Sequence, residues 1–249
     1  MPVNLVDFHC HLDLFPEFPD LVAECERRKI YTLTVTTTPR AWKRNFDLTQ
    51  SLKFVRAALG LHPQLVAQHH AELDLFCALL PAAIYVGEIG IDGSREYAPS
   101  LPLQRRVFDQ ILGACAANGG RVMSIHSRGA VTEVLDSIEQ NSSGGTAILH
   151  WFSGTPRQLE RAVELGCCFS VGPKMLQGAK GIDLVGRMPQ TRILTETDGP
   201  FARDDNGPLY PWAAETAISE LAKIWKLDAM ETREQICKNL SSLINQKQN

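Results

Sequence analysis

The chain has 249 residues, of which 44% are hydrophobic and 21% charged, and its formal net charge is −3 at pH 7. This composition excludes a mainly disordered chain, and the lack of about 18 consecutive uncharged apolar residues argues against a membrane-spanning helix. The mildly acidic charge also argues against a protein that coats nucleic acid by charge alone.

The N-terminal residues lack the basic, apolar and small-residue order of a secretory signal, so we expect a cytoplasmic protein with no membrane partner. The seven cysteines are an odd number without a CxxC spacing. They therefore do not form the pattern of a disulfide framework.

Eight short runs of apolar or β-branched residues recur along the chain and predict strands. Their starts lie 21 to 37 residues apart, which suits strand–helix–strand units of roughly 30 residues. The predicted strands are Val3–Phe8, Ile30–Thr36, Phe54–Gly60, Ile84–Glu88, Arg121–Ile125, Thr146–Leu149, Cys167–Val171 and Arg192–Thr195.

Helical spacing of apolar residues separates these runs. The clearest helices are predicted at Phe18–Lys29, Leu103–Asn118, Ala130–Gln140 and Pro156–Leu165, and two closing helices at Tyr210–Trp225 and Ala229–Asn245. Alternating strands and helices favour a parallel sheet, either open and doubly wound or closed into a barrel. The count of eight favours an α/β fold of the (β/α)8 TIM barrel type with closing C-terminal helices. No linker or repeat divides the chain, so we expect a single domain over residues 1–249.

Side chains that bind metals stand at the carboxyl ends of five predicted strands. They are His9 and His11 in the first, Glu88 in the fourth, His126 in the fifth, His150 in the sixth and Asp198 after the eighth. In a barrel these strand ends meet at one face, where active sites lie. Strand alternation also places His9 and His11 on one face, so that both can reach one ion.

Four histidines with two carboxylates fit two divalent ions, Mg, Mn or Zn, with Glu88 bridging them. Two ions about 3.5–4 Å apart clamp the attacking and leaving oxygens of a phosphoryl displacement. Asp198 would then act as ligand and proton acceptor. The alternative for Asp198 is a structural role, in a helix cap or in a turn at Asp198-Gly199-Pro200. Glu196 and Asp92 are expected to orient the ligands, and an ordinary interior salt bridge is the alternative for Glu196.

Six motifs in order make the chain resemble the TatD-like metal-dependent deoxyribonucleases of the amidohydrolase-type barrel superfamily. They are Asp7-Phe8-His9-Cys10-His11-Leu12-Asp13, Gly60-Leu61-His62-Pro63, Gly87-Glu88-Ile89-Gly90-Ile91-Asp92, Ile125-His126-Ser127-Arg128, His150-Trp151-Phe152-Ser153-Gly154 and Glu196-Thr197-Asp198-Gly199-Pro200. The resemblance implies a (β/α)8 barrel, two divalent metals and phosphodiester hydrolysis, often exonucleolytic. It assigns His9, His11 and Asp198 to one metal and His126 and His150 to the other, with Glu88 bridging.

Two segments depart from the usual family pattern, Ile91-Asp92-Gly93-Ser94-Arg95 and Val171-Gly172-Pro173-Lys174-Met175. With these variants and Thr36-Thr37-Thr38-Pro39-Arg40-Ala41-Trp42, the chain is similar to the TatD-type nuclease of Qat anti-phage defence systems. That likeness implies a bacterial multi-protein defence operon and partner proteins.

Phosphate binding beyond the metals needs cations at the same face, despite the negative net charge. Arg128, Lys174 and Arg40 are predicted to contact substrate, and His62 at a strand end either contacts phosphate or forms a turn with Pro63. Trp42 or Phe201 would stack a base. The alternative for these residues is solvated surface charge and packed aromatic rings.

The sequence favours a metal-dependent DNase, with DNA as its partner. One alternative is an amidohydrolase or a D-aminoacyl-tRNA deacylase on the same barrel, because fold alone does not decide the reaction. Glu88 argues against the amidohydrolases that place a modified lysine at this position. A non-catalytic subunit of a defence complex is the other alternative, which the retention of all six predicted ligands opposes.

Overall fold

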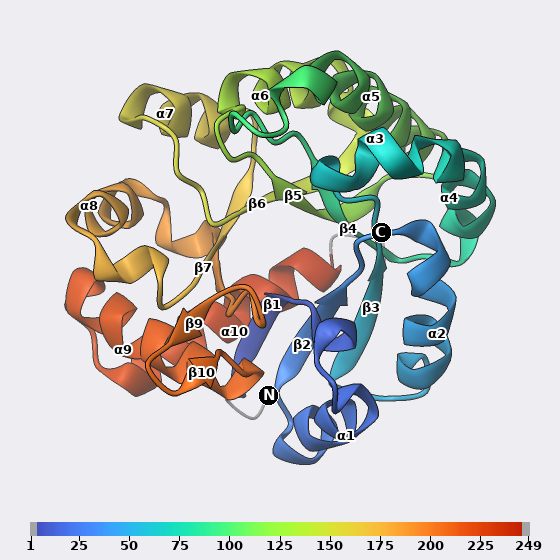
Figure 1. Cartoon of the computed structure of the whole chain (residues 1–249). Helices are drawn as coiled ribbons and strands as arrows, with labels where there is room; N and C mark the ends of the chain where they lie inside the picture. Colours follow the sequence, from blue (N-terminus) through green and yellow to red (C-terminus); the bar gives the residue numbers. More distant parts are fainter. Residues whose placement is uncertain (1–3, 246–249) are drawn as a thin grey trace. The chain divides into compact units, whose positions relative to one another are not determined.

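The computed structural model describes residues 4–245, in which eight strands alternate with helices (Figure 1). The strands form one sheet in chain order. The pairs β1–β2, β3–β4, β4–β5, β5–β6 and β7–β8 run parallel. Their bounds are β1 Val6–Cys10, β2 Tyr31–Val35, β3 Val55–Leu59, β4 Tyr85–Gly90, β5 Arg121–His126, β6 Gly145–His150, β7 Cys168–Val171 and β8 Ile193–Thr195. This order is that of the predicted (β/α)8 fold. The strand predicted at Val3–Phe8 is shifted toward His9, and its residue 3 lies outside the described residues.

Ten α-helices lie between and after the strands within residues 4–245, together with single 3-10 turns. They are α1 Phe18–Arg28, α2 Pro39–Thr49, α3 Val66–His69, α4 Leu73–Leu79, α5 Leu101–Ala117, α6 Val131–Gln140, α7 Pro156–Glu164, α8 Ala179–Arg187, α9 Ala214–Trp225 and α10 Ala229–Asn245. None of these described helices is long and apolar enough to cross a membrane.

The sequence patterns did not single out α2, α8 or a two-stranded hairpin of β9 Arg203–Asp204 and β10 Gly207–Pro208. In α8 the reason is glycine content, since Gly181 and Gly186 lower helix propensity. Gly181 is needed there, because a Cβ atom would lie 1.8 Å from the carbonyl oxygen of Met175.

The described residues divide into two compact units. Unit 1 contains residues 4–34, 48–56 and 169–245, and unit 2 contains residues 35–47 and 57–168. In unit 1, the buried face of α1 packs into a core with Cys10 and Leu12. That face comprises Phe18, Leu21, Val22 and Cys25, the spacing of one side of an α-helix.

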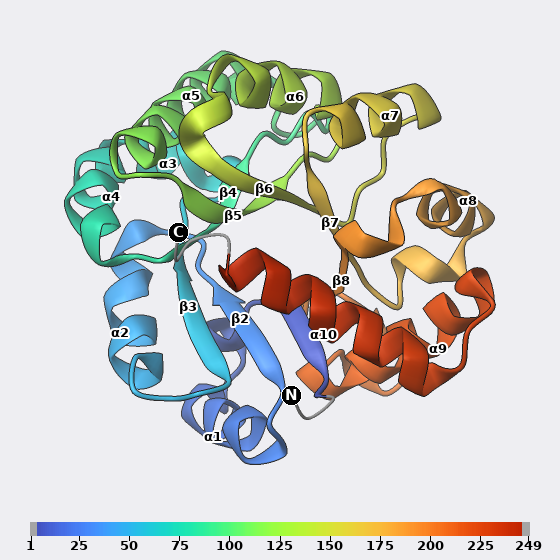
Figure 2. The same ribbon diagram turned by 180° about the vertical axis from the view of Figure 1, so that it is seen from behind.

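The two C-terminal helices of unit 1 pack on each other, and α10 also contacts β8 (Figure 2). Asn239 in α10 is buried and ties the helix to the approach to β8. Its Nδ2 donates to the carbonyl oxygens of Gln190 and Ile193, both at 2.7 Å, while Gln235 donates to its Oδ1 at 2.7 Å. These bonds satisfy two backbone carbonyls that α10 would otherwise cover without a donor.

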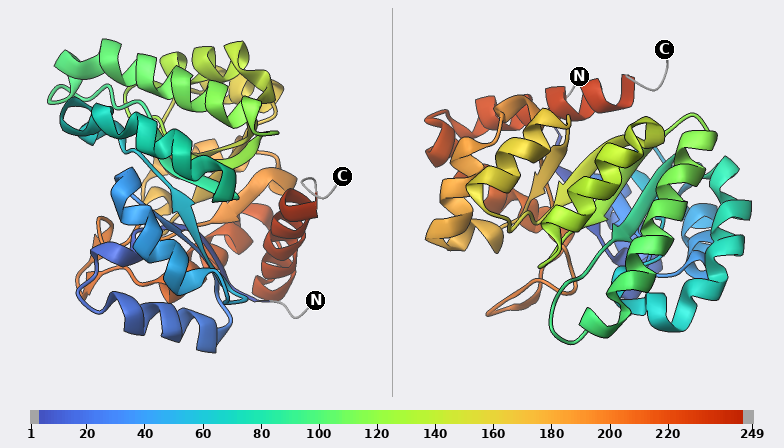
Figure 3. Two further views of the ribbon diagram at one scale, coloured as in Figure 1. Left: turned by 90° about the vertical axis from the view of Figure 1, so that its right-hand side faces the viewer. Right: turned by 90° about the horizontal axis from the view of Figure 1, so that it is seen from above.

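In unit 2, α5 and α6 run side by side and α5 packs on β4 (Figure 3). The end of β4 approaches the end of β5 closely: the backbone N–H of Ile91 donates to the carbonyl oxygen of His126 at 3.1 Å. Gly90 permits this approach, since its φ is +132° and a Cβ atom would lie 2.1 Å from that oxygen. Glycine therefore sets the spacing of two strand ends that carry Glu88 and His126.

We expect Asn239→Ala to lower the free energy of unfolding by about 1–3 kcal/mol, because two buried carbonyls lose their donor. Chemical denaturation monitored by circular dichroism measures the change. Lys238→Ala, on the exposed side of the same turn, is the matched control and should shift stability by less than about 0.5 kcal/mol. Equal effects of the two substitutions would contradict a stabilising role for the hydrogen bonds from Asn239 to Gln190 and Ile193.

Candidate metal centre

Unit 1 brings His9, His11 and Asp198 together. His9 lies in β1, His11 directly follows it, and Asp198 follows β8. Nε2 of His9 lies 3.6 Å and Nε2 of His11 3.8 Å from Oδ1 of Asp198, and all three residues are buried. One donor atom from each lies within 4.8 Å of the others, so two imidazoles and one carboxylate can reach a single ion.

Backbone hydrogen bonds fix the Asp198 segment against β1. The N–H of Asp198 donates to the carbonyl of His9 at 2.9 Å, and the N–H of His11 donates to the carbonyl of Gly199 at 2.8 Å. Asp198 itself has a left-handed backbone, with φ of 56°. Aspartate tolerates this conformation better than bulkier residues do, and the two bonds hold its carboxylate toward the histidines.

Asp7 lies beneath this group and was not predicted as a site residue. Its Oδ1 accepts from the Thr197 N–H at 2.9 Å and its Oδ2 from the Thr197 hydroxyl at 2.6 Å. Burial raises the pKa of Asp7, although these bonds oppose the shift. The sequence signal for Asp7 was its position two residues before His9, which puts both side chains on the same face of β1. Glu196, the residue before Thr197, accepts from the Ser170 hydroxyl at 2.5 Å.

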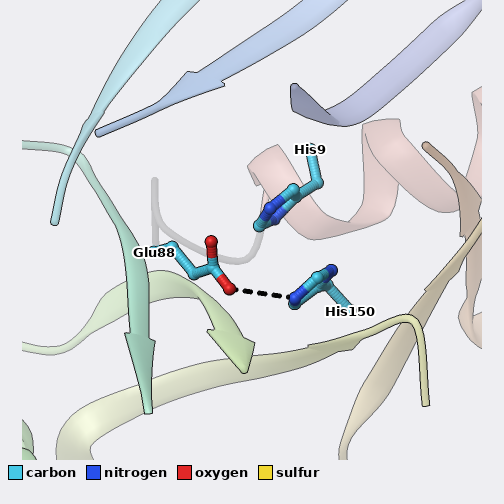
Figure 4. Close-up of side chains that lie close together, drawn as sticks. All are labelled: His9, Glu88 and His150. Atoms are coloured by element: carbon cyan, nitrogen blue, oxygen red, sulfur yellow. Dashed lines mark ion pairs between the residues drawn. The ribbon is translucent and has the colours of Figure 1, made fainter. Parts of the chain in front are cut away.

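Unit 2 gathers three imidazoles around the buried carboxylate of Glu88. Its Oε1 lies 2.7 Å from Nδ1 of His126 and 3.0 Å from Nε2 of His150, and its Oε2 lies 3.2 Å from Nε2 of His62. Figure 4 draws the Glu88–His150 ion pair, together with His9 of unit 1. Donor atoms of His62, Glu88 and His126 lie within 4.8 Å of one another.

His126 lies between two carboxylates, since its Nε2 is 2.9 Å from Oδ2 of Asp92. Burial disfavours the charged ring, but hydrogen bonds to Asp92 and Glu88 outweigh it and raise the pKa of His126. Burial also opposes ionisation of Asp92, yet bonds from His126, Ser94 and Gln64 hold the pKa of Asp92 well below its ordinary value. Asp92 is thus a fixed anion behind the ring.

Gln104 on α5 supports Asp92 and was missed by the sequence reasoning. It is fully buried, its Oε1 accepts from the Asp92 N–H at 2.7 Å, and its Nε2 donates to the Asp92 carbonyl at 3.3 Å. Gln64, also missed, donates to Oδ2 of Asp92 at 2.7 Å. The signal for Gln104 was an amide at a position that shares the apolar face of α5 with Val107 and Phe108.

The residues predicted to contact substrate occupy four different settings. His62 lies with its Nε2 at Glu88, so it belongs to the donor group as well as to the strand end. Arg40 is paired with Glu72, and Arg128 is exposed. Lys174 is half-buried, with Nζ 3.2 Å from Oε1 of Gln177.

The two aromatic residues predicted to stack a base differ in exposure. Trp42 is 2% exposed and stacks on Phe46 with ring centroids 4.6 Å apart, so it is a packing residue. Phe201 is 60% exposed. Burial therefore excludes Trp42 and leaves Phe201 available.

The donor chemistry of both groups fits divalent metals. Each combines imidazole nitrogens with a carboxylate, which suits Zn and other transition metals and accommodates Mg or Mn through its oxygens. Metal-binding histidines ordinarily donate their second ring nitrogen to a carboxylate or carbonyl, and Asp92 is such a partner for Nε2 of His126. The residues present therefore fit the expected cofactor.

Residues 6–245 match the family described as TatD related DNase. The chain is 27% identical to the metal-dependent hydrolase YjjV of Escherichia coli, over 98% of this chain and 99% of that protein. It is 25% identical to human deoxyribonuclease TATDN3, covering 97% and 94%, and 26% identical to the 3'-5' ssDNA/RNA exonuclease TatD of Edwardsiella piscicida, covering 74% of each.

The crystal structure of the E. coli YjjV protein superposes with a TM-score of 0.87 at 25% identity, covering 98% of both chains. This likeness confirms the (β/α)8 fold class. Because the family match spans nearly the whole chain, the protein belongs to the TatD family of metal-dependent hydrolases.

Proposed function

We propose that this hydrolase is a DNase that cleaves phosphodiester bonds exonucleolytically at a dinuclear metal centre. In this proposal His9, His11 and Asp198 would hold one ion, His126 and His150 would hold the other, and Glu88 would be shared between them. The observation that carries it is the placement of these six donors at the carboxyl ends of strands of one parallel sheet, where (β/α)8 enzymes carry their active sites.

When bound, two divalent ions neutralise charge on the phosphate and lower the pKa of a water molecule. The protein's own part is to orient the donors and to move a proton. Because Asp92 accepts from Nε2 of His126, Nδ1 of that ring lies on the side of Glu88, and it would offer its lone pair to an ion after losing its proton. We assign the proton-accepting role to Asp198, whose carboxylate is held in place by the backbone bonds at His9 and His11.

DNA is the proposed substrate because of the relatives and the arrangement of charge. Two of the relatives are a deoxyribonuclease and an ssDNA/RNA exonuclease. At a net charge of −3, substrate binding must rest on a few local contacts rather than on a broad basic surface. Arg128 and Lys174 are the proposed phosphate contacts, with Glu196 and Asp92 orienting the ligands.

Metal binding should stabilise the folded chain, since an ion that binds only the native state adds about 2.7 kcal/mol at a concentration of 100 times its Kd. We expect Mn²⁺ or Zn²⁺ to raise the Tm of the wild type, measured by differential scanning fluorimetry after chelator treatment. His11→Ala and His126→Ala should each reduce the rise, and together abolish it. The control is His70→Ala, an exposed histidine. An undiminished rise in the double variant would place the metal elsewhere.

The purified protein should degrade DNA with Mg²⁺ or Mn²⁺ and stop in excess chelator. Asp198→Asn should lower turnover by about 10²–10⁴-fold, because the amide no longer accepts the proton. Asp205→Asn, in the exposed β9–β10 turn, is the control and should keep full activity. The measurement is product release from labelled single- and double-stranded DNA, RNA and aminoacyl-tRNA. Deacylation without cleavage of DNA would replace the proposed reaction.

We further propose that the protein acts in a Qat-type anti-phage system with partner proteins. The support is the likeness of the segments around Arg40, Asp92 and Lys174 to that type of nuclease; those around Asp92 and Lys174 also differ from the usual family pattern. Plaque assays in a bacterial host that carries the gene with its genomic neighbours test this. Protection should be lost with Asp198→Asn and kept with Asp205→Asn. Full protection by Asp198→Asn would make the chain a non-catalytic subunit, and no protection in any form would remove the defence role.

A further inference from the structure

An exposed aromatic ring stands beside the donor group of unit 1. Phe201 is 60% exposed, whereas every other aromatic side chain in residues 4–245 is buried or half-buried. Its ring lies 4.9 Å from the His11 ring, centroid to centroid, at an interplanar angle of 87°. Leaving a phenylalanine in water costs free energy in proportion to its exposed apolar area. An exposed ring beside a predicted metal ligand therefore indicates a role in binding.

Two backbone hydrogen bonds of Ala202 hold the turn that carries Phe201. The N–H of Ala202 donates to the carbonyl of Asp198 at 2.9 Å, and the N–H of Leu209 donates to the carbonyl of Ala202 at 2.9 Å. Ala202 itself is 3% exposed. The ring is therefore carried on a rigid turn, which lowers the entropy lost when it binds a partner.

The other aromatic rings near this end of unit 1 already have partners. Tyr210 stacks between Phe15, at 5.1 Å, and Trp212, at 4.8 Å, and Arg28 covers the Trp212 ring at 4.2 Å. These rings pack on the core of α1. Phe201 differs because its contact with His11 leaves most of its surface in water.

We propose that Phe201 is the stacking platform for an unpaired nucleobase of the nucleotide whose phosphate is cleaved. This inference rests on the proposed nuclease function and adds a residue that contacts the substrate. A base and its phosphate are separated by one sugar, so a phosphate at the ion that His11 and Asp198 would hold brings its base within reach of the adjoining ring. Stacking on a phenyl ring tolerates every base, since each has a π-face.

The proposal makes single-stranded ends the substrate. In a duplex an internal base is covered on both faces, and a terminal base is held by its pairing partner and covered on one face, so an unpaired base reaches Phe201 at a lower cost than a paired one. Stacking does not sense the sugar 2'-hydroxyl, so Phe201 contributes equally to DNA and RNA. It also does not read sequence, because no hydrogen-bonding group lies on the phenyl ring.

The test compares Phe201→Ala, Phe201→Leu and Phe201→Trp with the wild type on a labelled single-stranded 10-mer. Loss of stacking should lower kcat/KM by about 5- to 150-fold in the Ala and Leu variants, and the Trp variant should stay within a few-fold of the wild type. Ile84→Ala and Met230→Ala remove other exposed apolar side chains and should change nothing. Thermal unfolding checks that each variant is folded.

A second 10-mer with one abasic position completes a double-mutant cycle. At one position near the cleaved end, the wild type should lose the same factor as Phe201→Ala, and the variant should not distinguish the two substrates. Additive losses at every position, or a Leu variant equal to the wild type, would overturn the stacking role while leaving nuclease activity intact.

Failure of the nuclease function itself has a different signature, since the wild type would then not cleave the intact 10-mer. In that case anisotropy of a fluorescein-labelled single-stranded 10-mer decides the inference. Weaker binding by Phe201→Ala than by Ile84→Ala supports a stacking platform without catalysis. Equal binding removes it.

Discussion

The carboxyl group of Glu88 imposes the main constraint on unit 2, because the residue is only 1% exposed. A buried carboxylate is strongly destabilising unless donors or cations surround it. His62, His126 and His150 approach it from three strand ends, and Asp92 balances the far side of the His126 ring. Removing a single partner therefore disturbs a connected group rather than one contact.

Unit 1 also surrounds a buried carboxylate with imidazoles, since Asp198 faces His9 and His11. There the backbone supplies the rigidity: β1 and the segment after β8 exchange hydrogen bonds at His9 and His11, and Asp7 holds Thr197 beneath them. A metal site gains affinity and specificity when its ligands are held before binding. Both donor groups meet this requirement through neighbours that do not themselves bind an ion, such as Thr197 and Gln104.

Much of the fold was predictable because its signals are local. Each β run was marked by its own residues, and α1, α6, α7 and α10 begin or end within a residue of the predicted bounds. The helix α8 was missed because Gly181 serves a contact with Met175 rather than helix propensity. That contact is made by a carbonyl oxygen in the turn just before the helix, and a pattern of apolar side chains does not record it.

The sequence by itself determined the chemical types of the donors and their positions at strand ends, because strand period and residue identity are properties of short segments. Only the tertiary structure decided which side chains meet. It placed His62 at Glu88, set Gln104 behind Asp92, and covered Trp42 while leaving Phe201 in water. Exposure and hydrogen bonding at these residues depend on packing between elements far apart in the chain, and that packing is fixed by the whole core rather than by any local pattern.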